Sequence, residues 1–243
     1  MTRVMQCALL LALVAACARS STSPAAAQVA APVARPAAAT PATPATLSLT
    51  RYEPEIRAFE TADRAAMPAA GGIVFFGSSS IRRWTSLTTD FPGLPVLNRG
   101  FGGSTFPEAN HYVARAVLAY HPRMVVVYEG DNDLTVGRTP QQVLADYREF
   151  VRLVRDSLPA ARIVVIGIKP SPSRWQLADQ QREANRLVRE AVARDTLQSY
   201  VDVFTPMLGD SGRPRPELFV GDSLHMTAAG YAIWRAQVAP HLR

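Results

Sequence analysis

Cysteine is almost absent from this chain, which has two among its 243 residues, Cys7 and Cys17. Both lie near the amino terminus, so the remainder of the chain can form neither a disulfide bond nor a thiolate metal site. Its stability must come from a buried core, and residues 48–243 are numerous enough to form one. Lysine is also scarce, because Lys169 is the only one and all other basic residues are arginines.

The charge is basic but not concentrated. The formal net charge is +6 at pH 7, yet the arginines are spread along the chain and form no basic stripe. Binding to DNA or RNA favours basic residues clustered on one face or helix. The distribution therefore gives no support to a nucleic-acid partner.

No apolar run is long enough to be a retained membrane span. The run from Cys7 to Ala16 follows a single positive charge at Arg3 and ends in small residues. It is too short to cross a hydrocarbon layer of ~30 Å as a helix. This pattern is typical of a secretory signal, so we expect residues 1–16 to be removed on export.

The end of that run carries a second pattern. Val14-Ala15-Ala16-Cys17 resembles the lipobox of bacterial lipoproteins. The resemblance implies cleavage before Cys17, acylation of Cys17 and a lipid anchor in the bacterial cell envelope. Ala18 follows the cysteine, which by resemblance to Gram-negative lipoproteins implies the outer membrane, with the domain exported and periplasm-facing. Ordinary secretory cleavage after an Ala-x-Ala-like site is the alternative.

A low-complexity segment follows. Residues 18–47 consist largely of Ala, Pro, Thr and Ser with almost no charge. Such a segment cannot bury enough apolar surface to offset the entropy lost on ordering. We therefore expect residues 17–47 to form a lipidated, disordered tether and residues 48–243 to form a single folded domain.

Within that domain, short apolar runs alternate with amphipathic segments. Strands are predicted over residues 73–76, 96–98, 124–128, 163–166 and 200–203. Helices are predicted over residues 52–64, 107–120, 140–158, 175–195 and 227–238, with caps at Ser104 or Thr105, at Thr139 and at Ser173. Continuously apolar strands alternating with helices form a parallel sheet covered on both faces. The sequence thus predicts an α/β fold: a three-layer α/β/α sandwich with about five parallel strands in flavodoxin-like order.

Polar and glycine-rich loops follow three of these strands. They are Gly77-Ser78-Ser79, the loop from Gly100 to Ser104, and Gly130-Asp131-Asn132-Asp133. Ligand sites in open parallel sheets gather at the carboxyl ends of the strands. We therefore expect the three loops to open onto one edge.

The pair Asp222 and His225 could supply a general base and the carboxylate that orients it. A spacing of three residues lets the carboxylate reach one ring nitrogen while the other faces a serine nucleophile. Each part also has a structural reading: Ser79 as a helix cap, Asn132 as a loop residue, and Asp222 with His225 as a surface ion pair or a cap. It is the order of the parts along the chain that favours catalysis.

Together these segments resemble the SGNH hydrolases, also called the GDSL family. The first family block is Gly-Asp-Ser-Leu, matched here by Gly77-Ser78-Ser79-Ser80, with Ser79 at the position of the nucleophile. The later blocks match Gly103, Asn132 and the pair Asp222–His225. The resemblance implies a flavodoxin-like hydrolase fold and an oxyanion hole made by the Ser79 amide, the Gly103 amide and the Asn132 side chain.

The match to the family blocks has one departure, and a second segment of the chain matches the first block misleadingly. Ser78 replaces the family aspartate, and its side chain is expected to form weaker turn hydrogen bonds. Three adjacent serines leave the nucleophile open to a shift of one residue. Gly221-Asp222-Ser223-Leu224 spells the family name, but no long apolar strand precedes it and Asp222 already pairs with His225. Ser223 is therefore rejected as nucleophile.

Other polar residues are candidates for binding a substrate or a metal ion. Lys169, Arg174 and Trp175 follow the fourth strand and are predicted to line a substrate cleft, the alternative being a rigid crossover loop. Glu129, Asp131 and Asp133 lack the spacing of a metal-binding loop, so no metal is expected. No organic cofactor is expected either.

Three functions follow from these patterns. The first is a serine esterase or acylhydrolase, including lysophospholipases, that works through an acyl-enzyme on an ester substrate. The second is a carbohydrate O-acetylesterase or O-acetyltransferase that acts on glycans. The third is a non-catalytic glycan- or lipid-binding lipoprotein. The absence of a long apolar insertion favours short acyl groups.

Overall fold

A computed structural model of the chain describes residues 48–243. Their core is a five-stranded sheet in the spatial order β2-β1-β3-β4-β5, and all neighbouring strands are parallel. This is the flavodoxin-like order, so the predicted fold class is confirmed. The predicted signal, the tether and Cys17 lie outside the described residues.

The strands are short, and the central ones are largely apolar. They are β1 (Ile73–Gly77), β2 (Val96–Gly100), β3 (Met124–Tyr128), β4 (Arg162–Ile166) and β5 (Gln198–Val201). Every residue of β1 and β3 is buried, as expected for central strands covered on both faces.

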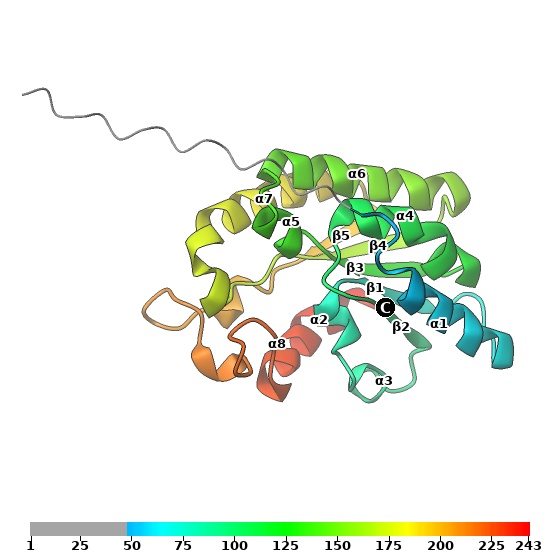
Figure 1. The fold of residues 1–243 in the computed structure, drawn as a ribbon, viewed down its shortest axis with the longest axis horizontal. Helices are drawn as coiled ribbons and strands as arrows, with labels where there is room; N and C mark the ends of the chain where they lie inside the picture. The colour runs from blue at the N-terminus through cyan, green and yellow to red at the C-terminus, as the bar shows by residue number, and fades with distance from the viewer. Residues whose placement is uncertain (1–47) are drawn as a thin grey trace, which may run out of the picture. The chain divides into compact units, whose positions relative to one another are not determined.

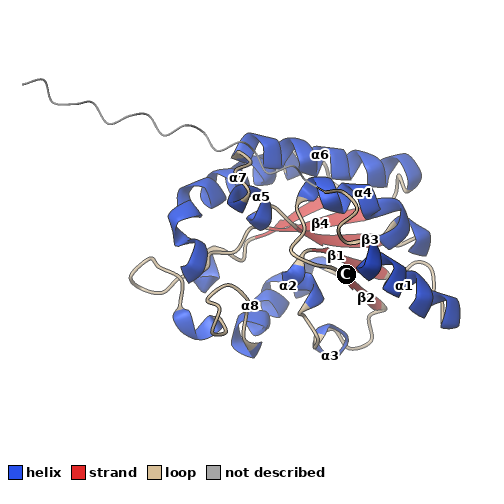
Figure 2. Cartoon of the chain, viewed as in Figure 1, coloured by secondary structure: helices blue, strands red, loops and turns tan. Residues whose placement is uncertain are grey.

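Helices cover both faces of the sheet (Figures 1 and 2). The α-helices are α1 (Glu53–Ala65), α2 (Ser79–Arg82), α3 (Leu87–Asp90), α4 (Phe106–Ala116), α5 (Asp131–Thr135), α6 (Pro140–Ser157), α7 (Ala178–Val192) and α8 (Ala228–Val238). Short 3₁₀ helices are η1 (Leu118–Tyr120), η2 (Pro172–Leu177), η3 (Thr205–Met207), η4 (Pro216–Leu218) and η5 (Ala239–His241).

Successive residues of each central strand pack into two separate hydrophobic cores, one on each face of the sheet. Val74 and Phe76 of β1 face α1, α4, α6 and α7, whereas Ile73 and Phe75 face α2, α3 and α8. This division follows from the two-residue period of a strand, which points successive side chains to opposite faces. The second core contains an aromatic cluster of Phe75, Trp84, Phe91, Tyr231 and Trp234.

Most predicted boundaries lie within one or two residues of those in the structure, and three segments differ for a physical reason. The last strand covers residues 198–201 rather than 200–203, because the Asp202 carboxylate accepts the backbone N–H groups of Phe204 and Thr205 and begins a turn there. The helix predicted over 107–120 ends at Ala116 and continues as η1 up to a left-handed residue, His121.

The third difference follows β4. The helix predicted over 175–195 is split into η2 and α7, and Ser173 is not its cap. Pro172 begins η2, and Arg174 has a non-helical backbone with φ −121°. The segment therefore forms a turn at the edge of the sheet instead of a first helical turn.

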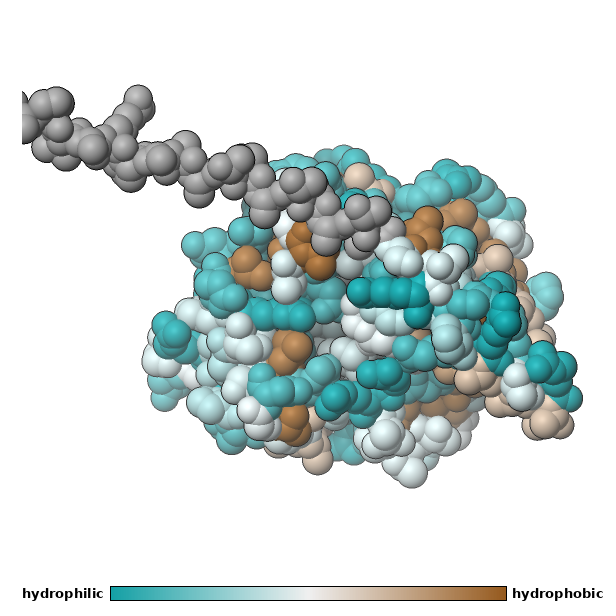
Figure 3. All heavy atoms as spheres, in the orientation of Figure 1, coloured by the Kyte–Doolittle hydropathy of each residue, from teal (hydrophilic) through white to brown (hydrophobic). Residues whose placement is uncertain are grey.

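Hydrophilic residues predominate on the face shown in Figure 3, and hydrophobic ones are scattered over it. Four large apolar side chains are exposed among the described residues: Leu49, Met67, Leu197 and Val220. None of the helices described for residues 48–243 combines the length and apolarity that a membrane crossing requires.

Candidate active site

Ser79, His225 and Asp222 form a hydrogen-bonded chain at the carboxyl edge of the sheet. The Ser79 hydroxyl lies 2.9 Å from His225 Nε2, although the two residues are 146 positions apart. On the other side of the ring, His225 Nδ1 lies 2.6 Å from Asp222 Oδ2. Ser79 is the first residue of α2, and His225 stands shortly before α8. This is the arrangement that activates a serine hydroxyl.

Backbone amides hold the Asp222 carboxylate in place. Its Oδ1 accepts the N–H groups of Leu224 and His225, at 2.9 Å and 2.8 Å. Burial opposes ionisation of Asp222, but hydrogen bonds from the His225 ring and from these amides outweigh it and keep the pKa of the carboxyl below its usual value. Asp222 is therefore an anion at neutral pH and fixes a proton on Nδ1 of His225.

Only one of the neighbouring serines faces the histidine. Ser78 and Ser80 are buried, with 2% and 4% of their surface exposed, whereas Ser79 is half-buried and lies beside the ring. Ser223 occupies a left-handed position with φ 56°, and its N–H donates to the Val220 carbonyl. Its role is to turn the loop between Asp222 and His225.

Gly77 makes the turn that presents Ser79. Its φ is +132°, and a Cβ atom at this position would collide with the Tyr128 carbonyl, so only glycine fits. The Ser78 N–H donates to that same carbonyl at 3.2 Å. Ser78 is the N-cap residue of α2, but its side chain makes no capping hydrogen bond. The loop is held through its backbone instead.

Neighbouring elements hold α2 from two sides. Asn98 of β2 donates to the Ile81 carbonyl at 2.7 Å and accepts the Gly100 N–H at 2.9 Å. From α8, the Tyr231 hydroxyl donates to the Ser80 carbonyl at 2.8 Å. These bonds fix the helix that begins with Ser79.

The three groups expected to bind a developing oxyanion lie on neighbouring loops. The Ser79 N–H stands at the first position of α2 and has no backbone acceptor among the described residues. The Asn132 side chain donates to the Ser104 carbonyl at 2.9 Å, and a Cβ built on Gly103 would lie 3.8 Å from its Nδ2. The loops that carry Ser79, Gly103 and Asn132 therefore converge, as the sequence predicts.

The Gly103 amide already has a partner. Its N–H donates to the Tyr52 hydroxyl at 3.1 Å, and Arg51 donates both to that hydroxyl and to the Gly103 carbonyl. The Tyr52 ring packs directly on Gly102, where no side chain would fit. For Gly103 to bind an oxyanion, its N–H must be shared with Tyr52 or released by it.

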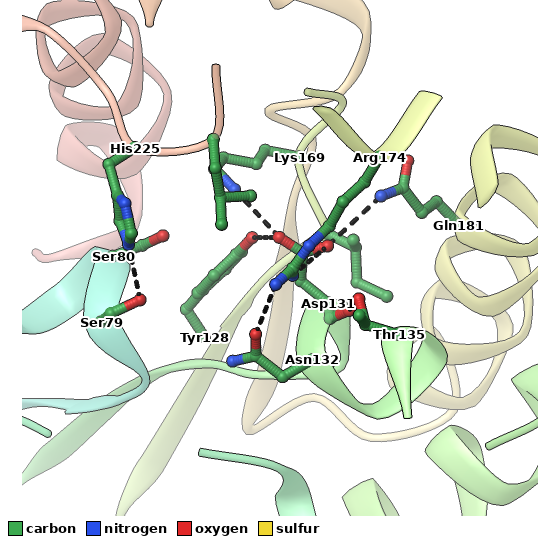
Figure 4. Close-up of polar contacts among 12 residues, drawn as sticks. Ser79, Ser80, Tyr128, Asp131, Asn132, Thr135, Lys169, Arg174, Gln181 and His225 are labelled. Carbon is green, nitrogen blue, oxygen red and sulfur yellow. Dashed lines mark hydrogen bonds and ion pairs between the residues drawn. The ribbon is translucent and has the colours of Figure 1, made fainter. Parts of the chain in front are cut away.

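The three residues expected to line a substrate cleft have different surroundings, and Figure 4 shows two of them, Lys169 and Arg174. Lys169 is fully buried, and its ammonium lies 2.9 Å from Asp131, so its placement in a cleft was wrong. A cation there is needed to compensate the buried carboxylate. Arg174 bonds Asp131 and Asn132. Trp175 is partly exposed and stacks on Phe204, with Arg182 and Arg213 over its ring.

The carboxylates around Asn132 have separate partners. Asp131 pairs with Lys169 and Arg174, and these cations overcome the effect of burial and lower the pKa of its carboxyl. Asp133 accepts the N–H groups of Phe106 and Gly130. Glu129 accepts the Ser104 hydroxyl at 2.6 Å. In residues 48–243, no group of three or more His, Cys, Asp or Glu side chains is placed to hold a metal ion.

Sequence reasoning missed Tyr52, Asn98 and the Asp131 ion pairs. Tyr52 lies 51 residues before Gly103, and Arg174 lies 42 residues after Asn132, so no local spacing indicates either contact. Only the position of Lys169 and Arg174 after a strand, at the same sheet edge, was a usable signal.

A family model and a relative of known name both match this chain. The model of the GDSL-like Lipase/Acylhydrolase family matches residues 63–233. The alpha1 subunit of platelet-activating factor acetylhydrolase IB from Bos taurus is 29% identical over 168 residues, which cover 65% of this chain and 69% of that protein.

Solved structures share the fold. A GDSL-like lipase from Bacteroides thetaiotaomicron superposes with a TM-score of 0.65 at 20% identity, covering 80% of this chain and 98% of the other. A catalytic mutant of an acetylxylan esterase from Geobacillus stearothermophilus gives 0.58 at 16% identity, covering 72% and 95%.

Asp133 makes the stability of the domain depend on pH. Burial raises the pKa of its carboxyl from 3.8 to about 7. Between these values the folded state keeps a proton that the unfolded state has released, so stability falls as pH rises through 7. We expect the wild-type protein to be less stable at pH 8 than at pH 5, with Asp133 contributing up to ~3 kcal/mol of the difference.

Urea unfolding at the two pH values checks this. Asp133→Asn should remove part of the difference, whereas Asp210→Asn, at an exposed position, should leave it unchanged. An undiminished pH dependence in Asp133→Asn would contradict the assignment.

Proposed function

The chain belongs to the GDSL-like lipase/acylhydrolase family and is an ester-bond hydrolase. We propose that it cleaves carboxylic esters of short acyl groups through an acyl-enzyme on Ser79. The observation that carries the proposal is the continuous chain from Ser79 through His225 to Asp222. No metal ion and no organic cofactor enters the proposed reaction.

In the first half-reaction, His225 Nε2 accepts the Ser79 proton as Oγ attacks the ester carbonyl carbon. Asp222 lies 2.6 Å from Nδ1 and stabilises the imidazolium that forms. The tetrahedral oxyanion is held by the Ser79 N–H and by Asn132, with the Gly103 N–H joining once Tyr52 shares it. The imidazolium then gives its proton to the leaving alcohol oxygen, the C–O bond breaks, and the acyl group remains on Ser79.

In the second half-reaction, water replaces the alcohol. His225 takes a proton from the water as its oxygen attacks the acyl carbon, and the same oxyanion donors stabilise the second tetrahedral intermediate. Return of the proton to Ser79 Oγ releases the carboxylic acid and restores the enzyme. The groups named therefore suffice for one full turnover.

A short acyl group is supported by two observations. Polar side chains lie near the Ser79–His225 pair: Asp222 bonds the His225 ring, and Asn132 and Arg174 bond each other on neighbouring loops (Figure 4). The names of the curated relative and of one structural neighbour both refer to acetyl esters, an acetylhydrolase and an acetylxylan esterase.

We further propose that Cys17 carries a lipid that anchors the exported domain to the bacterial envelope. The support is the Val14-Ala15-Ala16-Cys17 sequence behind a short apolar run. An anchored hydrolase would act on glycan or lipid esters of the envelope or its surroundings.

Ser79→Ala should abolish turnover. Removal of a serine nucleophile costs far more than ~10³-fold in kcat, so p-nitrophenyl acetate hydrolysis should fall to the background rate. A fluorophosphonate probe should label the Ser79 peptide in the wild-type protein, as read by mass spectrometry. Ser211→Ala, at an exposed serine that has no part in the site, serves as the control and should keep both label and turnover. A label on Ser78, Ser80 or Ser223 would overturn the assignment.

The acyl preference can be read from a series of p-nitrophenyl esters. We expect kcat/KM to be highest for acetate and to fall by more than ~10-fold by octanoate, because a longer chain would displace water from polar groups of the site without an apolar surface to pack against. Equal or rising values with chain length would contradict a short-acyl site and favour a lipid substrate.

The anchor is tested by expression of the full chain in a Gram-negative host. The wild-type protein should incorporate labelled palmitate and sediment with membranes, because one acylated terminus adds ~0.8 kcal/mol per buried CH₂. Cys17→Ala should lose the label and leave the membrane fraction, whereas Cys7→Ala should behave as the wild type. Membrane retention of unlabelled Cys17→Ala would contradict the proposal.

A further inference from the structure

We propose that Arg174 is a positioning residue for this reaction, one that orients the Asn132 amide toward the oxyanion; this inference rests on the proposed function. The guanidinium forks between two neighbouring side chains. One nitrogen lies 3.0 Å from Asp131 Oδ1, and the other donates to Asn132 Oδ1 at 2.9 Å. Figure 4 shows the fork above Asp131 and Asn132.

Arginine dictates which way the asparagine amide faces. A guanidinium has five N–H donors and no acceptor, so the Asn132 atom that meets it must be the oxygen. The amide nitrogen then faces the Ser104 carbonyl, 2.9 Å away, with one of its two N–H groups. In Figure 4 this nitrogen lies on the side of Ser79, and the oxygen lies on the side of Arg174. The second N–H is thereby left for the substrate.

The guanidinium has little freedom to move. The Arg174 side chain is only 14% exposed, and Asp131 is held in turn by Lys169 and by the Gln181 amide. The backbone is fixed as well, since the Ser173 N–H donates to the Ser223 carbonyl at 3.1 Å. Segment 172–177 therefore contacts both the oxyanion side of the site and the loop that carries His225.

Compensation of the buried Asp131 does not by itself explain this geometry. Lys169 already supplies a full charge at 2.9 Å. The second nitrogen of Arg174 is directed to a neutral amide instead of to Asp131. With Lys169 and Arg174 against Asp131, the formal charges sum to +1 beside the position where negative charge develops, which also favours the oxyanion.

A double-mutant cycle in the full chain separates this role from a structural one. Removal of one oxyanion donor costs about 10²–10³ in kcat, so loss of its positioning should cost less. We expect Arg174→Gln to lower kcat for p-nitrophenyl acetate by ~10- to 100-fold, with KM within ~3-fold of wild type. In an Asn132→Ala background the same change should lower kcat by less than ~3-fold, because there is no amide left to orient.

The controls keep the outcomes distinct. Arg186→Gln removes an exposed, ion-paired arginine from α7 and should leave kcat unchanged. If Arg174→Gln does not fold, Arg174→Lys retains a cation for Asp131 and is carried through the same cycle, with a smaller loss that again disappears in Asn132→Ala. The inference would be overturned if Arg174→Gln lowered kcat equally in the wild-type and Asn132→Ala backgrounds. It would also be overturned if Arg174→Gln lowered the unfolding temperature and left kcat unchanged.

Failure of the proposed function is recognised separately. A wild-type chain that neither hydrolyses any ester nor takes up the fluorophosphonate at Ser79 would overturn that function. If the wild type is active but the kcat decreases caused by Arg174→Gln and Asn132→Ala multiply independently in the double variant, only the positioning role is overturned.

Discussion

The hydrogen bond between Ser79 and His225 depends on how α2 and α8 pack together. Trp84 follows α2, and its ring lies 5.4 Å from Tyr231 and 5.8 Å from Trp234, both on α8. Tyr231 also bonds the Ser80 carbonyl. Aromatic rings in such contacts bury large areas and prefer defined geometries. The same interactions that close one core of the protein therefore hold a serine and a histidine, 146 residues apart, at 2.9 Å.

The fold was predictable because the central strands are short, largely apolar runs, and in a parallel sheet the carboxyl ends of the strands share one edge. That argument predicts from the sequence alone that Ser79, Gly103 and Asn132 lie together. It failed where polar contacts override local pattern. Gln198 and Ser199 belong to β5 although they look like loop residues, and Arg174 leaves helical geometry and binds Asp131 and Asn132. The burial of Lys169 could not be predicted from the sequence either, because it depends on an ion pair with Asp131, 38 residues away.

The loop after β3 accommodates three carboxyl groups in two ways. Asp131 remains charged because two cations compensate it. Among the described residues no cation pairs with Glu129, and Asp133 has only Arg138, at 3.7 Å. Burial therefore raises the pKa of both, that of Glu129 well above its usual value with Asp133 adding to the effect. Buried groups of this kind weaken a fold unless they are hydrogen-bonded. Here they accept from Ser104, Phe106 and Gly130, so they connect the loops that carry Gly103 and Asn132.

Tyr52 gives the start of the domain a direct part in the geometry of the site. Its hydroxyl accepts the Gly103 N–H, and its neighbour Arg51 holds the Gly103 carbonyl. The minimal catalytic unit therefore cannot be trimmed to the first helix, at Glu53, without altering the glycine loop. A shortened version of this enzyme has to begin ahead of Arg51, although both residues precede every strand and the whole span matched by the family model.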